Sequence, residues 1–97
     1  MLRRMVVVTV PPEKAAEAEK IWKQECAPLM IQQPGCLGEE FLRNVENRGE
    51  VISLQTWENQ QAIDQYRASA AHREILQHTR GLMGVSKVEV RTYEVVG

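Results

Sequence analysis

A turn signal, Asn47-Arg48-Gly49, lies at the middle of the chain between two extended runs. The first run covers residues 36–45 and the second covers residues 50–57, and such a pair predicts a β-hairpin. On each side of the hairpin the apolar residues change to a helical spacing, and beyond each helical segment the sequence is extended again. The hairpin therefore lies between two helix-and-strand units.

The N-terminal unit begins with a β-branched run over residues 3–10 that predicts the first strand. Pro11-Pro12 ends this strand, because proline cannot donate to the hydrogen-bond ladder and suits a helix start. The helix predicted over residues 13–29 carries an apolar stripe that consists of Ala15, Ala18, Trp22, Cys26 and Leu29. Pro34-Gly35 is a turn signal that closes the unit.

The C-terminal unit begins at Asn59, which is placed to cap the second helix. That helix first buries one side, and we expect Ser69 to cap it again before the stripe continues. The expected stripe is Ala62, Ile63, Tyr66, His72, Ile75, Leu76, Thr79, Leu82 and Met83. Gly81 and Gly84 mark its end, and a last strand is predicted over residues 86–96.

The resulting order, β-α-β-β-α-β, predicts an α+β fold of the ferredoxin-like type. In that fold an antiparallel sheet carries both helices on one face. We expect one domain over residues 1–97, since the chain contains no linker and no repeat.

Side-chain alternation along the strands predicts which residues share a face. The row expected under the helices is Val6, Val8, Val10, Ile52, Leu54, Thr56, Val88, Val90 and Thr92. The opposite row is Met5, Val7, Thr9, Leu37, Glu39, Phe41, Val51, Ser53, Gln55, Trp57, Glu89, Arg91, Tyr93 and Val95. Leaving the large apolar groups of the second row exposed would forgo several kcal/mol. We therefore expect a homodimer in which two such faces enclose a barrel.

Composition and charge narrow the classes of partner. The net charge of −1 argues against nucleic acid as a partner, which needs clustered Lys and Arg. The apolar run at the N-terminus is too short for a signal sequence, and no segment is long enough to span a bilayer. Cys26 and Cys36 match no metal spacing and are expected to be reduced thiols in a cytoplasmic protein without metal or other cofactors.

Several segments are similar to one known family. The segments are Pro34-Gly35-Cys36-Leu37-Gly38, Trp57-Glu58-Asn59-Gln60-Gln61-Ala62-Ile63, Tyr66-Arg67-Ala68-Ser69 with His72, and the closing strand. Together they resemble the antibiotic biosynthesis monooxygenase family over essentially the whole chain. The resemblance implies a dimeric α/β barrel. Some members oxidise aromatic polyketides with molecular oxygen and neither metal nor flavin, whereas others degrade haem or isomerise small signalling sugars.

Individual positions match the family unevenly. Trp57 matches the tryptophan at the end of the third strand, whereas Ser53 replaces an asparagine that the polyketide oxygenases carry one step earlier. Tyr66 and Leu76 stand where the haem degraders have a tryptophan and the haem-ligating histidine. The resemblance thus favours a cofactor-independent monooxygenase of a small phenolic or quinol compound over a haem degrader. The alternatives are a non-catalytic ligand-binding or stress-related dimer, or an isomerase on the same fold.

Three residues are candidates for catalysis, each with a structural alternative. His72 is a general base or a partly buried histidine bonded to a backbone carbonyl. Trp57 stacks on an aromatic substrate or packs against the next helix. Tyr66 donates its hydroxyl to the substrate or covers the core. We expect a pocket bordered by these three side chains between the sheet and the second helix.

The candidates for substrate binding are Ser53, Phe41, Glu39 and Arg91. Together with Arg43 and Glu89, the charged members are expected on one face of the sheet. They either anchor a polar group of the ligand inside the barrel or pair with each other across the dimer seam.

Overall fold

The computed structural model describes residues 1–80 and 87–97. Its strands are β1 (Leu2–Thr9), β2 (Cys36–Arg43), β3 (Glu50–Trp57) and β4 (Lys87–Glu94). They form an antiparallel sheet in the order β2-β3-β1-β4. β2 and β4 are therefore the edges, and β1 and β3 lie in the centre.

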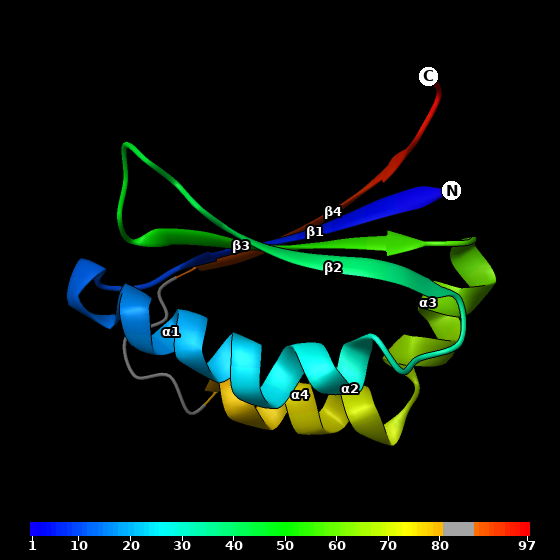
Figure 1. The fold of residues 1–97 in the computed structure, drawn as a ribbon, viewed down its shortest axis with the longest axis horizontal. Coiled ribbons are helices and arrows are strands. Elements are labelled where there is room, and N and C mark those ends of the chain that lie inside the picture. Colours follow the sequence, from blue (N-terminus) through cyan, green and yellow to red (C-terminus); the bar gives the residue numbers. More distant parts are fainter. Residues whose placement is uncertain (81–86) are drawn as a thin grey trace.

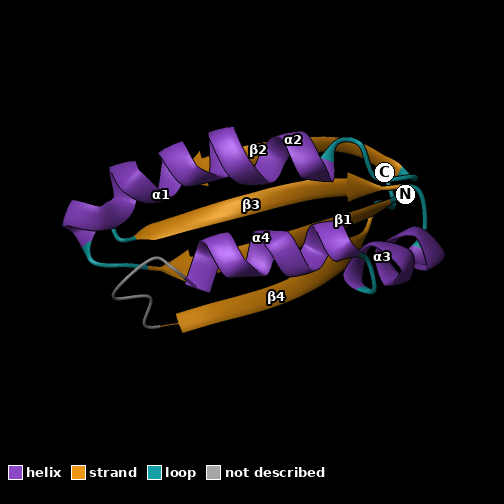
Figure 2. Cartoon of the chain, turned by 90° about the horizontal axis from the view of Figure 1, so that it is seen from below, coloured by secondary structure: helices purple, strands orange, loops and turns teal. Residues whose placement is uncertain are grey.

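The helical segments lie on one side of this sheet (Figure 1). A 3-10 turn, Pro12–Lys14, leads into α1 (Ala15–Ile21), and a π-helical segment, Trp22–Cys26, joins α1 to α2 (Ala27–Met30). The second helical unit consists of α3 (Gln60–Arg67) and α4 (Ala70–Arg80). Figure 2 shows this helical layer in front of the sheet, with β4 at the outer edge. The fold is α+β and ferredoxin-like, which confirms the prediction from element order.

The first helical unit is interrupted by its own sequence. Pro28 has no N–H for the carbonyl of Gln24, and in an α-helix its ring would collide with that carbonyl. The chain widens into a π turn just before it, where the N–H of Ala27 donates to the carbonyl of Trp22, five residues back. Trp22 begins this turn on the side that faces β2.

The caps of the second helical unit are those that the sequence predicts. Asn59 Oδ1 accepts from the N–H of Ala62 at 2.9 Å and starts α3. Ser69 ends α3 by donating to the carbonyl of Tyr66 at 2.6 Å, and it starts α4 by accepting from the N–H of His72 at 3.2 Å. The predicted end of the helix at Gly81 and Gly84 lies outside the described residues.

The two tight turns depend on glycine. Gly35 has a φ of +83°, and a Cβ there would lie 2.4 Å from the Cβ of Ala62. A Cβ on Gly49, in the predicted hairpin turn, would lie 2.4 Å from the carbonyl oxygen of Val10. Both turns therefore need a residue without a side chain.

The sheet register corrects the predicted faces. Arg4 pairs with Gln55, and Val6 pairs with Ser53. The even-numbered residues of β1 therefore share a face with the odd-numbered residues of β3, not with Ile52, Leu54 and Thr56 as the alternation alone suggested. A shift of one residue in pairing moves every side chain of a strand to the other face. Trp57 and Ser53 thus lie under the helices, and the Ile52 row lies on the face that no described helix covers.

A β-bulge sets the faces of β2. Cys36 pairs with Trp57, but Gly38 pairs with Thr56, so Leu37 is an extra residue in the ladder. After this bulge the odd-numbered residues point to the helices. The prediction that Glu39 and Phe41 belong to the uncovered face is wrong for this reason.

The core lies between β3 and the helices at the end of the sheet where β3 finishes. Trp57, Ile63 and Cys26 are almost fully buried there, and Met30 and Tyr66 pack with them. Both cysteines are free. No helix among the described residues is long and apolar enough to cross a membrane.

Candidate active site

A row of polar side chains crosses the helix-covered face of the sheet at its centre. Gln55 on β3 pairs with Arg4 on β1 and with Glu39 on β2. The exposed fractions of Arg4 and Gln55 are only 6% and 1%, respectively. Buried polar groups are costly unless they are hydrogen-bonded, so a row of three at the centre of a sheet marks a candidate site.

Gln55 organises this row through its side-chain amide. Its Oε1 accepts from Arg4 Nη1 at 3.2 Å and from Trp57 Nε1 at 2.9 Å. Its Nε2 donates to Ser53 Oγ at 3.3 Å. The indole of Trp57, which is fully buried, is therefore tied to the same network as the guanidinium of Arg4.

Glu39 is the acidic end of the network. Its Oε1 accepts from Ser53 Oγ at 2.5 Å and from Trp22 Nε1 at 2.9 Å. Its Oε2 is buried and has no hydrogen-bond partner within the described part of the chain. Burial raises the pKa of Glu39 to about 7, although the hydrogen bonds from Ser53 and Trp22 and the charge of Arg4 favour the ionised form.

Arg4 is the basic end. Its guanidinium lies 6.0 Å from the ring centroid of Tyr66, at cation–π distance, and no ion pair of Arg4 occurs within the described ranges. Burial lowers the pKa of Arg4, while the nearby Tyr66 and Glu39 act in the opposite direction. Within the described part of the chain the charge of this buried guanidinium is therefore not neutralised by direct contact with a carboxylate.

Aromatic rings continue the site toward α4. The rings of Trp57 and Tyr66 are 5.1 Å apart, and His72 meets Tyr66 edge-on at 5.0 Å. Burial raises the pKa of Tyr66, so its hydroxyl stays protonated. Burial and the charge of Arg4 lower the pKa of His72, against a hydrogen bond with the backbone of Arg67 that raises it. The imidazole is therefore mainly neutral at pH 7.

An open groove of about 580 Å³ reaches the acidic end of the network from outside. Glu39 lines it together with the rings of Trp22 and Phe41, whose centroids are 5.1 Å apart. Its mouth lies between α1 and the end of β2. The groove thus combines an aromatic wall of two tilted rings with a carboxyl group whose pKa is close to neutral pH.

The predicted site residues fall into three groups. Glu39, Ser53 and Phe41 lie at or beside the groove. Trp57, Tyr66 and His72 contact one another, but Trp57 and Tyr66 are buried and do not line this groove. Arg91 is on the opposite face, because it pairs with Met5. The expectation that Arg91 and Glu39 face the same space is wrong.

Two residues of the network were missed in the sequence. Arg4 interrupts an apolar run at a position that shares its parity with Val6 and Val8, so alternation alone could have placed it on the buried face. Trp22 was assigned to the apolar stripe, but a partly buried indole N–H needs an acceptor, and Glu39 supplies it. No three His, Cys, Asp or Glu side chains form a metal-binding group within the described ranges.

Most of the chain matches the sequence model of one protein family. The sequence model of the antibiotic biosynthesis monooxygenase family matches residues 1–78. The chain belongs to this family. The residues of the network and of the groove all lie within the part of the chain that matches the family model. No curated protein matches the chain at a significant level.

Solved structures share the fold of this family member at low sequence identity. A candidate antibiotic biosynthesis monooxygenase from Bordetella bronchiseptica is 21% identical, with a TM-score of 0.86 over 98% of this chain and 96% of its own. One from Deinococcus radiodurans is 18% identical, with a TM-score of 0.84 over 100% and 94%. A conserved protein from Methanosarcina mazei is 22% identical, with a TM-score of 0.81 over 95% and 89%. At these identities the likeness shows the fold alone.

Proposed function

We propose that this protein is a cofactor-independent monooxygenase of small phenols or quinols and that Glu39 is its base. The observation that carries the proposal is the state of this carboxyl group. It lines a groove with an aromatic wall, one oxygen is held by Ser53 and Trp22, and the other has no hydrogen-bond partner among residues 1–80 and 87–97. With a pKa of about 7 it can both accept and return a proton at neutral pH.

In the proposed reaction the carboxyl group of Glu39 acts first. Glu39 takes the hydroxyl proton of a phenol that stacks against Trp22 and Phe41. The phenolate passes one electron to O₂, and the resulting radical and superoxide join through a carbon–oxygen bond at the para carbon. Glu39 returns its proton to the peroxide. Loss of the para C–H proton then breaks the O–O bond, which gives a quinone and water.

The balance of this reaction needs no external reductant, because the phenol supplies all four electrons. The buried charge of Arg4 favours the anionic intermediates electrostatically. Ser53 keeps the carboxyl group of Glu39 in place, and Gln55 links Ser53 to Arg4. Trp57 and Tyr66 act as the rigid support behind this row, and His72 is the second titratable group of the proposed site.

The proposed assembly is a homodimer through the uncovered sheet face, in the reducing environment of the cytoplasm. Met5, Val7, Ile52 and Leu54 share that face with Tyr93, and no described helix packs on them. The two free cysteines fit a reducing compartment. A second sheet would cover these apolar groups and complete a barrel.

Oxygen uptake by the metal-free protein with 1-naphthol tests this function. We expect one O₂ consumed per naphthol, 1,4-naphthoquinone as the product, and no oxygen released when catalase is added. Glu39→Gln should lower kcat/KM by about 10²–10⁴-fold, since the base is lost. Glu17→Gln is the control, because it removes an exposed carboxylate on α1 that pairs with Lys14 and does not line the groove.

Other results would overturn parts of the proposal. Saturable naphthol binding without oxygen uptake would favour the non-catalytic ligand-binding protein. Full activity in Glu39→Gln, together with loss of activity in His72→Ala, would assign the base to His72 instead.

A further inference from the structure

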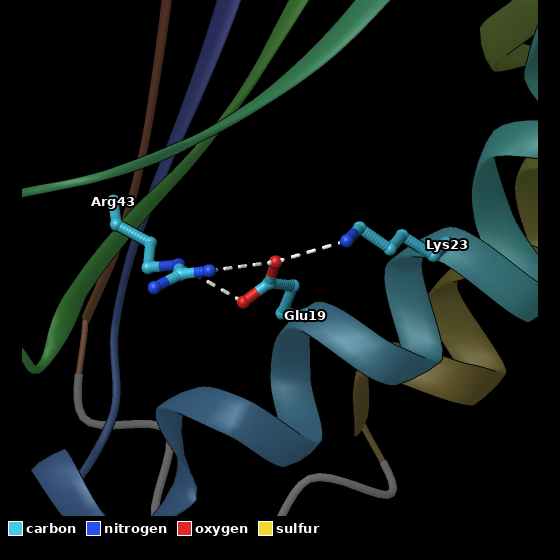
Figure 3. A network of polar contacts seen from close by, with 3 residues as sticks. All are labelled: Glu19, Lys23 and Arg43. Carbon is cyan, nitrogen blue, oxygen red and sulfur yellow. Dashed lines mark hydrogen bonds and ion pairs between the residues drawn. The ribbon is translucent and has the colours of Figure 1, made fainter.

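The mouth of the groove carries a cluster of charges that the proposed reaction does not use. Glu19 on α1 lies between Lys23 in the π segment and Arg43 at the end of β2 (Figure 3). Arg43 contacts both carboxylate oxygens of Glu19, with Nε 3.0 Å from Oε2 and Nη2 3.2 Å from Oε1. Lys23 Nζ lies 3.1 Å from Oε1. All three residues line the groove.

The charges in this cluster do not balance. Two cations share the single carboxylate of Glu19, which is the least exposed of the three side chains. Glu40 also lines the groove, but it pairs with Arg3 on the other face of the sheet. Within the cluster of Glu19, Lys23 and Arg43 the net charge is therefore +1, which complements a monoanion.

The two cations also keep free donors. An ammonium group has three N–H donors and a guanidinium group has five, and only a few of these point at Glu19. Lys23 and Arg43 are 62% and 71% exposed, so their unused donors are open to the groove and to solvent. An incoming carboxylate could join the cluster without displacing Glu19.

The distance from this cluster to Glu39 limits the size of the ligand. Glu39, Phe41 and Arg43 are alternate residues on one face of β2. The first and last of them are therefore separated by about 13 Å along the strand at the Cα atoms. A ligand that spans this separation consists of about one aromatic ring with a short arm, and Phe41 is the residue between the two ends.

We infer that the groove binds hydroxylated aromatic acids, with the ring on Trp22 and Phe41, the hydroxyl at Glu39 and the carboxylate at Lys23 and Arg43. This inference rests on the proposed function only in taking the groove as its substrate site. It narrows the substrate class from phenols in general to phenols that carry a carboxylate on a short arm.

Calorimetric titration with a matched pair of ligands tests the inference. The probes are 3-hydroxyphenylacetate and its neutral analogue 3-hydroxyphenylacetamide, which keep the para C–H that the proposed reaction needs and differ in charge but hardly in shape. We expect the acid to bind about ten-fold more tightly at low salt, since charge-assisted hydrogen bonds to a fork of donors exceed neutral ones. The preference should shrink as salt rises, because the cations are exposed.

Variants of the cluster test how each charge affects the binding of the acid. Arg43→Gln and Lys23→Gln should each remove most of the preference, whereas Lys14→Gln, which removes the same charge near α1 outside the groove, should not. Glu19→Gln should tighten binding of the acid, because a competing carboxylate is lost. Circular dichroism checks that each variant is folded.

Several outcomes would overturn the inference: equal binding of acid and amide, no saturable binding of either, an unchanged preference in Arg43→Gln, or weaker acid binding in Glu19→Gln. These outcomes are distinct from failure of the proposed reaction. The preference for the acid is measured by binding without turnover, whereas the proposed reaction is measured by oxygen uptake with uncharged naphthol, so either can fail while the other holds.

Discussion

At the centre of the sheet, the two faces differ in the opposite sense from those of a typical α+β domain. The face under the helices carries Arg4, Gln55, Ser53 and Glu39 at its centre, joined by hydrogen bonds. The face without helices carries Met5, Val7, Ile52 and Leu54 in the corresponding rows. A sheet with one covered face normally places apolar residues inside and polar residues outside.

Each face of the sheet therefore carries residues whose positions cannot be explained by stability alone. A buried polar row costs desolvation and weakens the core, so its presence points to chemistry. A partly exposed apolar row loses part of the gain of burial, so its presence points to a partner surface. In this molecule the candidate site and the proposed interface are back to back on the same strands, and β1 and β3 contribute to both.

The largest expected effect concerns the uncovered face. Leu54→Arg should dissociate the proposed homodimer, because it places an unpaired charge in the middle of the apolar row. We expect the dimer to weaken by at least about 100-fold, which is about 3 kcal/mol. Sedimentation velocity at micromolar concentration should show a shift to the 11.1 kDa monomer.

Gln61→Arg is the control for this change, since Gln61 is exposed on α3 and adds the same charge on the helical side. A parent protein that already sediments as a monomer would contradict the interpretation of the uncovered face. The apolar residues of the uncovered face would then not mark a partner surface.

The next effect concerns the covered face and depends on pH. The pKa of Glu39 is raised to about 7, so the folded protein holds this proton more tightly than the unfolded chain does. The contribution of Glu39 to the free energy of unfolding should therefore be largest at pH 4.5 and below, and it should decrease as the pH rises to 7. The expected loss is on the order of 3 kcal/mol, because each pKa unit corresponds to about 1.4 kcal/mol.

Urea unfolding between pH 4.5 and 8 measures this dependence. Glu39→Gln should flatten the curve and be the more stable protein at pH 7, whereas Glu40→Gln on the other face should keep the slope of the parent. A slope that is identical in the parent and in Glu39→Gln would contradict the assignment of the raised pKa.

Local signals in the sequence predicted the elements well. Asn59 and Ser69 cap the helices, and Asn47-Arg48-Gly49 turns the hairpin, because each acts through bonds to backbone atoms a few residues away. The element order then predicts the ferredoxin-like sheet, since few topologies accommodate it.

The pairing of β3 could not be predicted from its own residues. The Ile52 and Leu54 row is more apolar than the Ser53 and Gln55 row, so hydrophobicity assigned the wrong one to the core. The actual row is satisfied by partners on β1 and β2, which are distant in sequence. The bulge at Leu37 likewise inverts the faces of β2 without a clear signal. For this reason Glu39 was expected on the correct strand but on the wrong face.

The smallest expected effect tests whether the buried polar row serves function or stability. Arg4→Met should change the free energy of unfolding by less than about 1 kcal/mol, or raise it, because an apolar side chain of similar length avoids burying a cation without an ion pair. Gln55 Oε1 keeps its second donor, the indole of Trp57. Gln55→Leu is the contrasting variant, since it leaves both that indole and the Arg4 guanidinium without their acceptor, and it should cost about 2–3 kcal/mol.

Unfolding in guanidinium chloride at pH 7 compares the stabilities of the two variants, and naphthol oxidation is followed in parallel. A stable Arg4→Met protein with impaired turnover would mean that the charge of the guanidinium serves the reaction and not the stability of the fold. A loss of more than about 2 kcal/mol would instead make Arg4 part of the core, and the contrast between the two faces would no longer identify a functional row.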